Sequence, residues 1–219
     1  MAATKTQSVE EAIWDLEPLV DGKGPAGVDE LLDEAQSQAT ALADNKGHIA
    51  EFDGARLATY MNDLAGVYDL VGRAGSYAGL AFSADMSDEK RGALMQKVQE
   101  RATEIETTLL FFHLEWAKLS DEQVDELLAF KGLDKARHYL RSARRYRDFL
   151  LTEPEEKILS EKSVTGEAAW ERLFGELTSA LEIDLDGETT GIEHALSQLH
   201  NPDREVRKRA AEAVTEGLD

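Results

Sequence analysis

Apolar residues recur at intervals of three and four along most of the chain, and this spacing predicts a largely helical protein. A first helix is expected from Leu31 to a stop signal at Gly47, and Asp53 is expected to cap a second, longer helix. Glycine lowers helix stability by roughly 1 kcal/mol relative to alanine. We therefore expect close contact with a neighbouring helix to offset the cost of four glycines in the second helix, Gly66, Gly72, Gly75 and Gly79.

Three further helices are predicted between residues 87 and 149. Ser87 is expected to cap the first of them, whose apolar stripe ends near Trp116. Ser120 and Gln123 form a capping-box pattern that predicts a short helix ending near Gly132. Residues 133–149 are expected to form one more helix, the fifth in the chain.

Residues 151–173 begin with a second capping-box pattern, made by Thr152 and Glu155. Pro154 then falls in the first turn of a sixth helix, where its missing N–H does no harm. The glutamates of this turn are interpreted as capping charges that the helix dipole favours. The next helix is expected to begin near Thr165, and its Trp170 is expected to be a packing residue.

The helical pattern fails once, in a segment of strict alternation from Leu181 to Leu185 that is followed by Asp186-Gly187. A short helix over residues 192–199 is expected next, and then a last helix with Asn201 as its cap and Pro202 in its first turn. The fold class is therefore mostly α, a multi-helix array or bundle with one small β-hairpin near residues 181–190. Residues 1–219 are expected to form one lobe, which leaves open a subdivision into a bundle (1–150) and a unit of helices and hairpin (151–219).

The composition and charge of the chain exclude several classes of partner and site. The chain has 44 acidic and 24 basic residues among 219, and its net charge of −20 repels nucleic acids and anionic membranes, so neither is expected as a partner. The excess acid is interpreted as a solubilising surface. The chain has no cysteine, which excludes disulfides, thiolate metal sites and a cysteine nucleophile. Residues 1–11 contain no apolar secretion signal, so a cytoplasmic location is expected.

Histidine spacing predicts neither a catalytic nor a metal-binding residue in this chain. His113 and Glu115 are two positions apart, so they project to different sides of a helix and cannot share an ion. His194 and His200 are six apart and face no common ligand position. An HExxH sequence, which places two histidines and a catalytic glutamate on one helix, is absent.

The fifth predicted helix carries an unusual concentration of positive charge. Its arginines follow an i, i+4, i+7, i+8 pattern and are expected to make one cationic face, formed by Arg137, Arg141, Arg144 and Arg145. These four residues are the candidate substrate-binding residues, because such a face can hold an anion or a peptide carboxylate. The favoured alternative is a face that pairs with the chain's own excess carboxylates.

Several segments along the chain resemble, in the same order, the N-terminal region of the oligoendopeptidase F family, relatives of the thimet oligopeptidases. These segments are Trp14-Asp15-Leu16-Glu17-Pro18-Leu19, Tyr77-Ala78-Gly79-Leu80-Ala81-Phe82, Phe111-Phe112 to Leu119, Leu151 to Glu156, Ala169-Trp170, Asp186-Gly187 and Asn201 to Arg207. Each segment is weak by itself, and their common order carries the resemblance.

The resemblance implies a helical lobe that forms one wall of a deep channel in a zinc metalloendopeptidase of short peptides. In that family zinc is held by an HExxH helix and a glutamate acts as general base on the bound water. This chain would then hold no cofactor itself, would be inactive alone and would need a C-terminal catalytic domain as its partner. Short peptides reach such an enzyme through the channel, and the lobe could also take part in a homo-oligomer. Whether the end at Asp219 is natural or a truncation stays open.

The alternative is a stand-alone, non-catalytic helical module that binds peptides or a protein. A monomeric, cooperatively folded chain that binds short peptides without added metal would favour this module. Large exposed apolar patches would favour a lobe separated from its enzyme.

Overall fold

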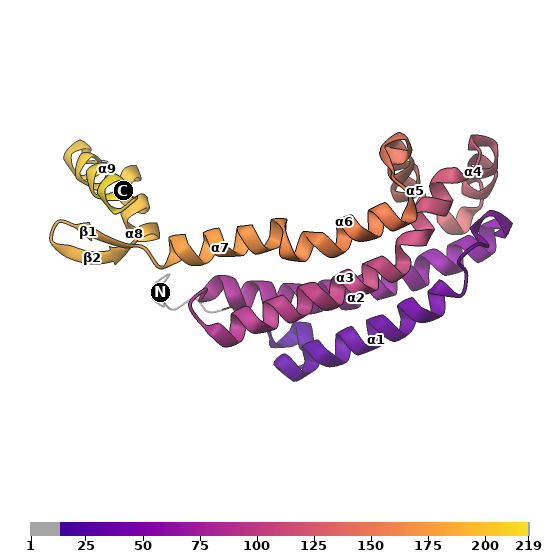
Figure 1. The fold of residues 1–219 in the computed structure, drawn as a ribbon, viewed down its shortest axis with the longest axis horizontal. Helices are drawn as coiled ribbons and strands as arrows, with labels where there is room; N and C mark the ends of the chain where they lie inside the picture. Colours follow the sequence, from indigo (N-terminus) through magenta and orange to yellow (C-terminus); the bar gives the residue numbers. More distant parts are fainter. Residues whose placement is uncertain (1–13, 219) are drawn as a thin grey trace, which may run out of the picture.

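The structure, a computed structural model, describes residues 14–218 (Figure 1). Its α-helices and strands are α1 (Pro25–Ala43), α2 (Gly54–Ala84), α3 (Glu89–Lys118), α4 (Asp121–Leu128), α5 (Arg137–Ala143), α6 (Glu153–Thr165), α7 (Glu167–Ser179), β1 (Glu182–Leu185), β2 (Glu188–Gly191), α8 (Ile192–Ser197) and α9 (Arg204–Leu218). Short 3₁₀ turns connect them at η2 (Glu17–Val20), η3 (Ile49–Glu51), η4 (Lys131–Leu133), η5 (Arg144–Phe149) and η6 (Gln198–His200). The predicted fold class, mostly α with one small hairpin, is confirmed.

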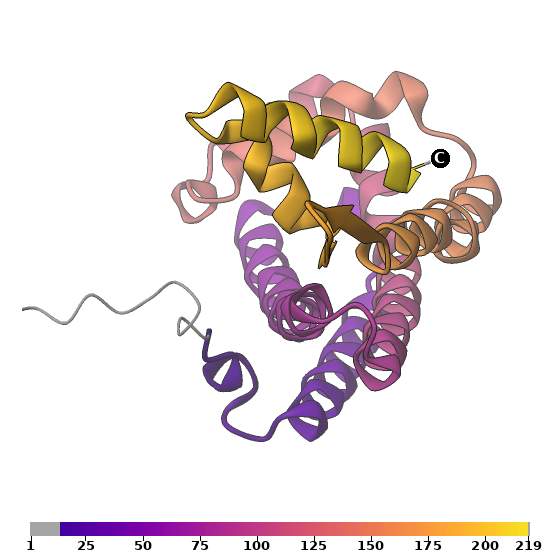
Figure 2. The same cartoon turned by 90° about the vertical axis from the view of Figure 1, so that its left-hand side faces the viewer.

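Helices α1, α2 and α3 pack on one another and enclose the main hydrophobic core. Figure 2 shows the three helices from one end of the molecule. Tyr60 of α2 stacks on Phe112 of α3 with ring centroids 4.8 Å apart, and Phe112 stacks in turn near Trp116. The side chains that carry this core are fully buried at Leu32, Leu57, Leu64, Ile105, Leu109, Phe112 and Trp116.

The starts of α2 and α3 follow short-range capping chemistry. The Asp53 carboxylate accepts a hydrogen bond from Arg56 N at 2.7 Å, so the predicted cap of α2 is confirmed. Helix α3 is capped by Asp88, which accepts from Lys90 N at 2.8 Å, and not by Ser87 as the sequence predicts. Ser87 instead donates its hydroxyl to Asp85 in the preceding turn.

The glycines of α2 do not mark one close helix contact, and this expectation is wrong for two of the four. A Cβ added to Gly72 or Gly75 would meet no atom within 4 Å. A Cβ at Gly66 would lie 3.5 Å from a side-chain atom of Gln38, and one at Gly79 would lie 4.0 Å from Met95 Sδ. The reason is geometric, because Gly72 and Gly75 lie on a side of α2 that no other helix covers closely.

The predicted fifth helix over residues 133–149 is also wrong, because this segment folds as η4, α5 and η5 in succession. Trp116 of α3 donates its indole N–H to the Leu140 carbonyl at 2.9 Å. A continuing α-helix would use that carbonyl to accept from residue 144. This tertiary hydrogen bond ties α5 to α3, and beyond α5 the chain continues as the 3₁₀ turn η5.

Helices α6 and α7 form a rod that runs back along the bundle, with α6 packed against α3 (Figure 1). We call residues 153–179 the arm. The capping box of Thr152 and Glu155 is confirmed at the start of the arm, and Gly166 joins its two helices. Neither α6 nor α7 contains a buried residue.

A small second core follows the arm. Strands β1 and β2 pair antiparallel, with Ile183 opposite Thr190, and the turn between them uses positive φ at Asp186 (58°) and Gly187 (86°). Helix α9 packs on β1 and helps to bury Ile183, Ile192, Ala195 and Val214. The last helix starts after Asp203, whose carboxylate accepts from Glu205 N at 2.8 Å, so the predicted cap at Asn201 is two residues too early.

Candidate functional site

The four candidate arginines do not form one cationic face. Arg144 is 8% exposed and turns inward, since η5 has replaced the expected helix. Arg137 donates to the Leu128 carbonyl and to Asp134, at 3.1 and 2.6 Å, and Arg141 lies 3.8 Å from Asp125. Arg145 is exposed, and no ion pair joins it to a carboxylate among residues 14–218. The geometry matches the alternative of self-pairing for three of the four, and substrate binding by these residues stays a prediction.

Arg144 instead closes the end of α3. Its guanidinium donates to the carbonyls of Trp116 and Leu119, at 2.7 and 2.8 Å, and to Asp121 Oδ1 at 2.8 Å. The carbonyls at the end of a helix have no partner within the helix, so this side chain acts as a C-terminal cap. Arg147, and after it Arg144, lower the pKa of Asp121 by hydrogen bonding to its carboxylate.

The described residues offer no donor set for a metal. Within residues 14–218, three histidine or acidic side chains never gather closely enough to hold an ion. His113 and Glu115 diverge, as their spacing indicates: Glu115 accepts from the backbone N–H groups of Gly47 and Ile49, at 2.7 and 3.3 Å. His113 Nε2 lies 3.2 Å from the Tyr139 hydroxyl. The zinc that the resemblance implies therefore does not fit the residues present here.

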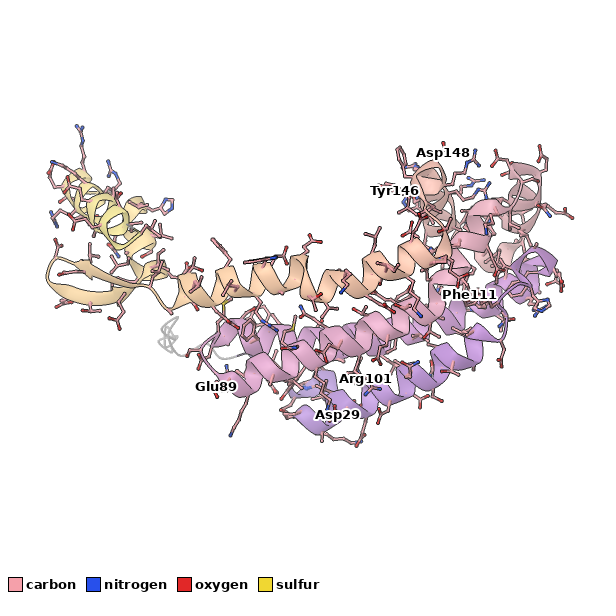
Figure 3. All side chains as sticks on the ribbon, in the orientation of Figure 1. Asp29, Glu89, Arg101, Phe111, Tyr146 and Asp148 are labelled. Carbon is pink, nitrogen blue, oxygen red and sulfur yellow. The ribbon has the colours of Figure 1, made fainter. Side chains whose placement is uncertain are left out.

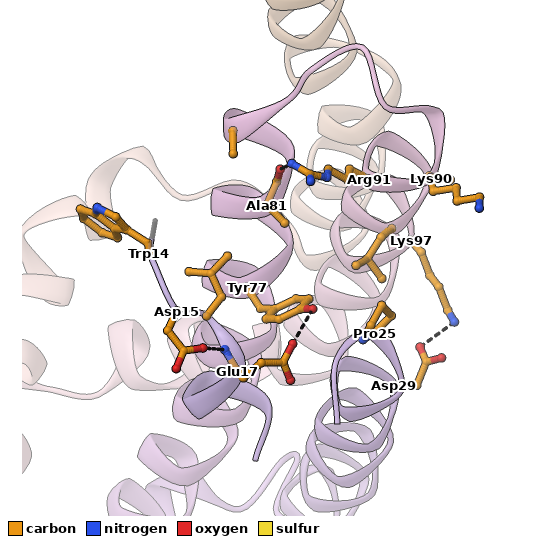
Figure 4. Close-up of a pocket in the computed structure, with 14 residues that line it drawn as sticks. Trp14, Asp15, Glu17, Pro25, Asp29, Tyr77, Ala81, Lys90, Arg91 and Lys97 are labelled. Carbon is orange, nitrogen blue, oxygen red and sulfur yellow. Dashed lines mark hydrogen bonds and ion pairs between the residues drawn. The ribbon is translucent and has the colours of Figure 1, made fainter. Parts of the chain in front are cut away.

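A cavity of about 870 Å³ lies where η2 and the start of α1 meet the end of α2 and the start of α3 (Figure 4). Trp14, whose side chain is 76% exposed, and the Tyr77 ring are among its lining residues. The apolar lining is completed by Leu16, Pro25, Ala81, Ala84, Ala93 and Leu94. This combination provides a surface for an apolar side chain of a ligand.

Charges of both signs also line this cavity. Cations come from the first turns of α3, at Lys90, Arg91 and Lys97, and carboxylates come from Asp15, Glu17 and Asp29. Lys97 Nζ lies 2.6 Å from Asp29 Oδ1, and Arg91 donates to the Ala81 carbonyl at 2.9 Å. The Tyr77 hydroxyl donates to Glu17 at 3.3 Å, and burial together with that carboxylate raises the pKa of Tyr77.

Sequence reasoning did not find this cavity, although a signal was present. Two segments that carry the family resemblance, Trp14 to Leu19 and Tyr77 to Phe82, are far apart in sequence and meet at its lining. Segments that resemble one family at two distant positions are natural candidates for spatial contact. Nothing in the residue pattern alone, however, places Lys90 and Lys97 beside them.

A second cavity, of about 410 Å³, lies between α2, η4 and α5. Met61, Leu64 and Leu133 give it an apolar lining, and Tyr68 and Tyr139 contribute hydroxyl groups. Burial, with smaller contributions from Tyr139 and Glu106, raises the pKa of Tyr68 to about 12. Burial also lowers the pKa of the neighbouring His113. Burial thus disfavours the charged forms of Tyr68 and His113.

Exposed apolar side chains concentrate in residues 146–177. Figure 3 labels Tyr146 and Asp148 on η5, beside α5, and Tyr146 is 67% exposed. The arm carries six more, which we call the outer stripe: Ile158, Leu159, Trp170, Leu173, Phe174 and Leu177. Trp170, which is expected to be a packing residue, is 70% exposed and is not packed in a core of the described residues. Among residues 14–218 no helix is both long and apolar enough to cross a membrane.

Comparison with solved structures first defines the class of fold. The crystal structure of oligoendopeptidase-F from Enterococcus faecium is similar to this chain with a TM-score of 0.71 and 20% sequence identity. The match covers 87% of this chain and 39% of that chain. A candidate peptidase from Chlamydophila abortus matches with a TM-score of 0.49 and 20% identity, over 95% of this chain and 36% of that one. The Enterococcus faecium match shows that the fold is an all-α lobe of the kind found in oligoendopeptidase-F.

Sequence comparison matches part of the chain to a family model. Residues 115–182 match the family model for the N-terminal region of peptidase family M3, described as oligopeptidase F. A search among curated proteins finds no match. The predicted resemblance to the N-terminal region of the oligoendopeptidase F family is confirmed by the family model and by the fold together. The chain spans well under half of the Enterococcus faecium chain that it matches.

Proposed function

We propose that this chain is the N-terminal lobe of an oligopeptidase F-type metalloendopeptidase that hydrolyses short peptides. The observation that carries the proposal is the family match at residues 115–182. The likeness in fold to the Enterococcus faecium oligoendopeptidase-F supports it over 87% of the chain. Because the match covers 39% of that chain, peptide hydrolysis is proposed for the whole enzyme and not for this lobe.

Zinc is the proposed metal of the whole enzyme, and this lobe is proposed not to hold a zinc site by itself. The support is chemical: a hydrolytic zinc site needs three protein ligands, and residues 14–218 bring no such group together. The lobe alone is therefore proposed to be inactive. In this proposal the lobe binds and positions the peptide, and the rest of the enzyme carries out its hydrolysis.

The proposed role of the lobe is to form one wall of a channel for peptides. Helices α2 and α3 contain 31 and 30 residues, and at 1.5 Å per residue each is about 45 Å long. A wall of that length accommodates roughly a dozen residues of extended peptide, at about 3.3 Å per residue. A narrow channel of this kind would restrict substrates to short, unstructured peptides.

The second candidate function is a stand-alone peptide-binding module. The observation that favours it is the 870 Å³ cavity, whose lining combines an apolar patch with cations on one helix and carboxylates opposite. Those charges complement the two ionised ends of a short peptide. The outer stripe argues the other way, because large exposed apolar surfaces are typical of a lobe that lacks its partner.

The test is a chimera. Residues 14–218 would replace the matched segment of full-length Enterococcus faecium oligoendopeptidase-F, and cleavage of a quenched fluorescent peptide would be measured with the unaltered enzyme as positive control. We expect cleavage by the chimera, its loss on adding a metal chelator, and no cleavage by this chain alone with added zinc. A folded chimera without activity would contradict the proposal. Peptide binding by the chain alone, without metal and as a monomer, would favour the module instead.

A further inference from the structure

The arm is the part of the described chain with the least internal support. Neither of its helices has a buried residue, whereas α1, α2 and α3 each have at least seven. Its six outer-stripe side chains are between 41% and 70% exposed. An isolated helix of this length is marginal in water, and most helices in proteins gain their stability from packing of an apolar side. The arm is therefore built for contacts that residues 14–218 do not supply.

An amphipathic helix normally turns its apolar side toward the protein core. Helix α7 instead turns its polar side toward the bundle. Arg172 donates to Gln96 of α3 at 3.0 Å, and a Cβ at Gly175 would lie 3.4 Å from Met86 Sδ. Small and polar residues thus face the bundle. Trp170 and Phe174 each lie two positions from Arg172, so they project about 160° away from it. The apolar side of α7 consequently points away from the protein's own core.

The spacing of the stripe indicates what kind of surface it meets. Trp170, Leu173, Phe174 and Leu177 follow an i, i+3, i+4, i+7 pattern, which is the pattern of anchors that a helix places in an apolar groove. In Figure 1, α4 and α5 rise at one end of the arm, and α8 and α9 rise on the same side at the other end. This anchor pattern indicates that the stripe packs into an apolar groove on a folded protein.

The charge of the chain excludes two of the molecules that could cover the outer stripe. A net charge of −20 repels an anionic membrane and also a second copy of the chain. The occupant that the comparisons support is the rest of an oligopeptidase F-type chain. The whole arm lies inside the segment that matches the family model, and most of the Enterococcus faecium chain lies outside the match.

We infer that the outer stripe is the surface on which the remainder of an oligopeptidase F-type enzyme packs, and this inference rests on the proposed function. The arm then connects the bundle to the rest of the enzyme: its polar side holds α3, and its apolar side holds the partner. Burying the stripe would order α6 and α7 and fix the position of the bundle relative to the remainder.

The experiment uses the chimera and hydrogen–deuterium exchange of residues 153–179. The matched pair of variants is Leu173→Ser in the stripe and Leu80→Ser on α2, because both leucines are 41% exposed. We expect the amides of the arm to exchange at least tenfold more slowly in the chimera than in this chain alone. Leu173→Ser should reverse that protection and lower the Tm of the chimera, while Leu80→Ser should change neither.

Exchange of the arm that is equally fast in the chimera and in the chain alone would overturn the inference. Equal effects of Leu173→Ser and Leu80→Ser would overturn it as well. The two proposals fail separately. A chimera that cleaves peptide with an unprotected arm leaves the proposed function standing, and a folded, inactive chimera with a protected arm contradicts the function but supports the docking surface.

A second measurement keeps the inference testable if the chimera does not fold. Sedimentation velocity of this chain alone is expected to show a monomer. A dimer that Leu173→Ser dissociates and Leu80→Ser does not would assign the outer stripe to a second copy of the chain, and this would overturn the inference.

Discussion

The three-helix bundle and helix α7 of the arm are built from similar amphipathic sequences and reach opposite outcomes. In the bundle, apolar residues of α1, α2 and α3 meet in a core where Trp116 is 1% exposed. In the arm, the apolar residues of α7 point outward and Trp170 is 70% exposed. The bundle buries its apolar side chains against other parts of the chain. The apolar side chains of the arm stay exposed and are available to another surface. An amphipathic pattern thus predicts a helix with a partner without saying which molecule supplies it.

The largest expected difference is between two tryptophans. Trp116→Ala removes a buried ring and its hydrogen bond to Leu140, so we expect the free energy of unfolding to fall by about 3–5 kcal/mol. Trp170→Ala removes an exposed ring and should change it by no more than about 0.5 kcal/mol in this chain alone. Urea denaturation followed by circular dichroism measures both. Equal losses would show that the arm has a core of its own.

Removing the arginine that caps α3 is expected to give the next largest fall in the free energy of unfolding. Arg144→Ala leaves the carbonyls of Trp116 and Leu119 without their side-chain partner, and we expect a loss of about 2–3 kcal/mol. The matched control is Arg145→Ala, one residue along and exposed, with an expected change within about 0.5 kcal/mol. The same urea titration compares the two variants. A larger effect at Arg145 would mean that η5 is oriented differently from the structure.

Glycine substitution should strengthen the bundle slightly. Gly72→Ala adds a methyl group into open space on a helix, and the better helix propensity should raise the free energy of unfolding by about 0.5–1 kcal/mol. Gly27→Ala is the contrasting variant, because its Cβ would lie 2.5 Å from the Val20 carbonyl oxygen and should destabilise the fold. Thermal unfolding detects both shifts. A destabilising Gly72→Ala would reveal a helix contact that restores the expectation from sequence.

The smallest expected effect is a pH dependence that belongs to the bundle. Burial lowers the pKa of His113 from its ordinary value of 6.5, so the unfolded chain binds this proton more readily than the folded one. The contribution of His113 to stability is therefore present above pH 6.5 and is lost as the pH falls through its folded pKa. Burial raises the pKa of nearby Glu106 and acts with the opposite sign. The difference between the unaltered chain and His113→Gln, measured by urea denaturation from pH 7.5 to 5, isolates the histidine.

Short-range signals in the sequence predicted much of the fold. The capping boxes of Ser120 with Gln123 and of Thr152 with Glu155 are confirmed, because each needs only groups three residues apart. The turn at Asp186-Gly187 is confirmed for the same reason, since its positive φ angles are a local requirement. Order of motifs along the chain also sufficed for the family resemblance, which the match at residues 115–182 confirms.

Long-range contacts account for what the sequence pattern missed. The expected helix over residues 133–149 is divided into η4, α5 and η5, and Trp116, more than twenty positions away, binds a carbonyl within this segment. The expected cationic face fails because Arg144 turns inward to close α3. The cavity beside Trp14 and Tyr77 depends on four segments meeting, and the residue pattern of each segment contains no information about the other three.

The sequence by itself determined most of the helices, most of their caps, the hairpin and the family resemblance, because these depend on residues close together along the chain or on the order of short motifs. Tertiary structure decided which side of each helix is buried. Hydrophobic periodicity fixes the angle between the apolar and polar sides of a helix but leaves its rotation about its own axis to the neighbours that it meets. In α1 to α3 those neighbours bury the apolar side within the chain, and in α7 no neighbour among the described residues does so.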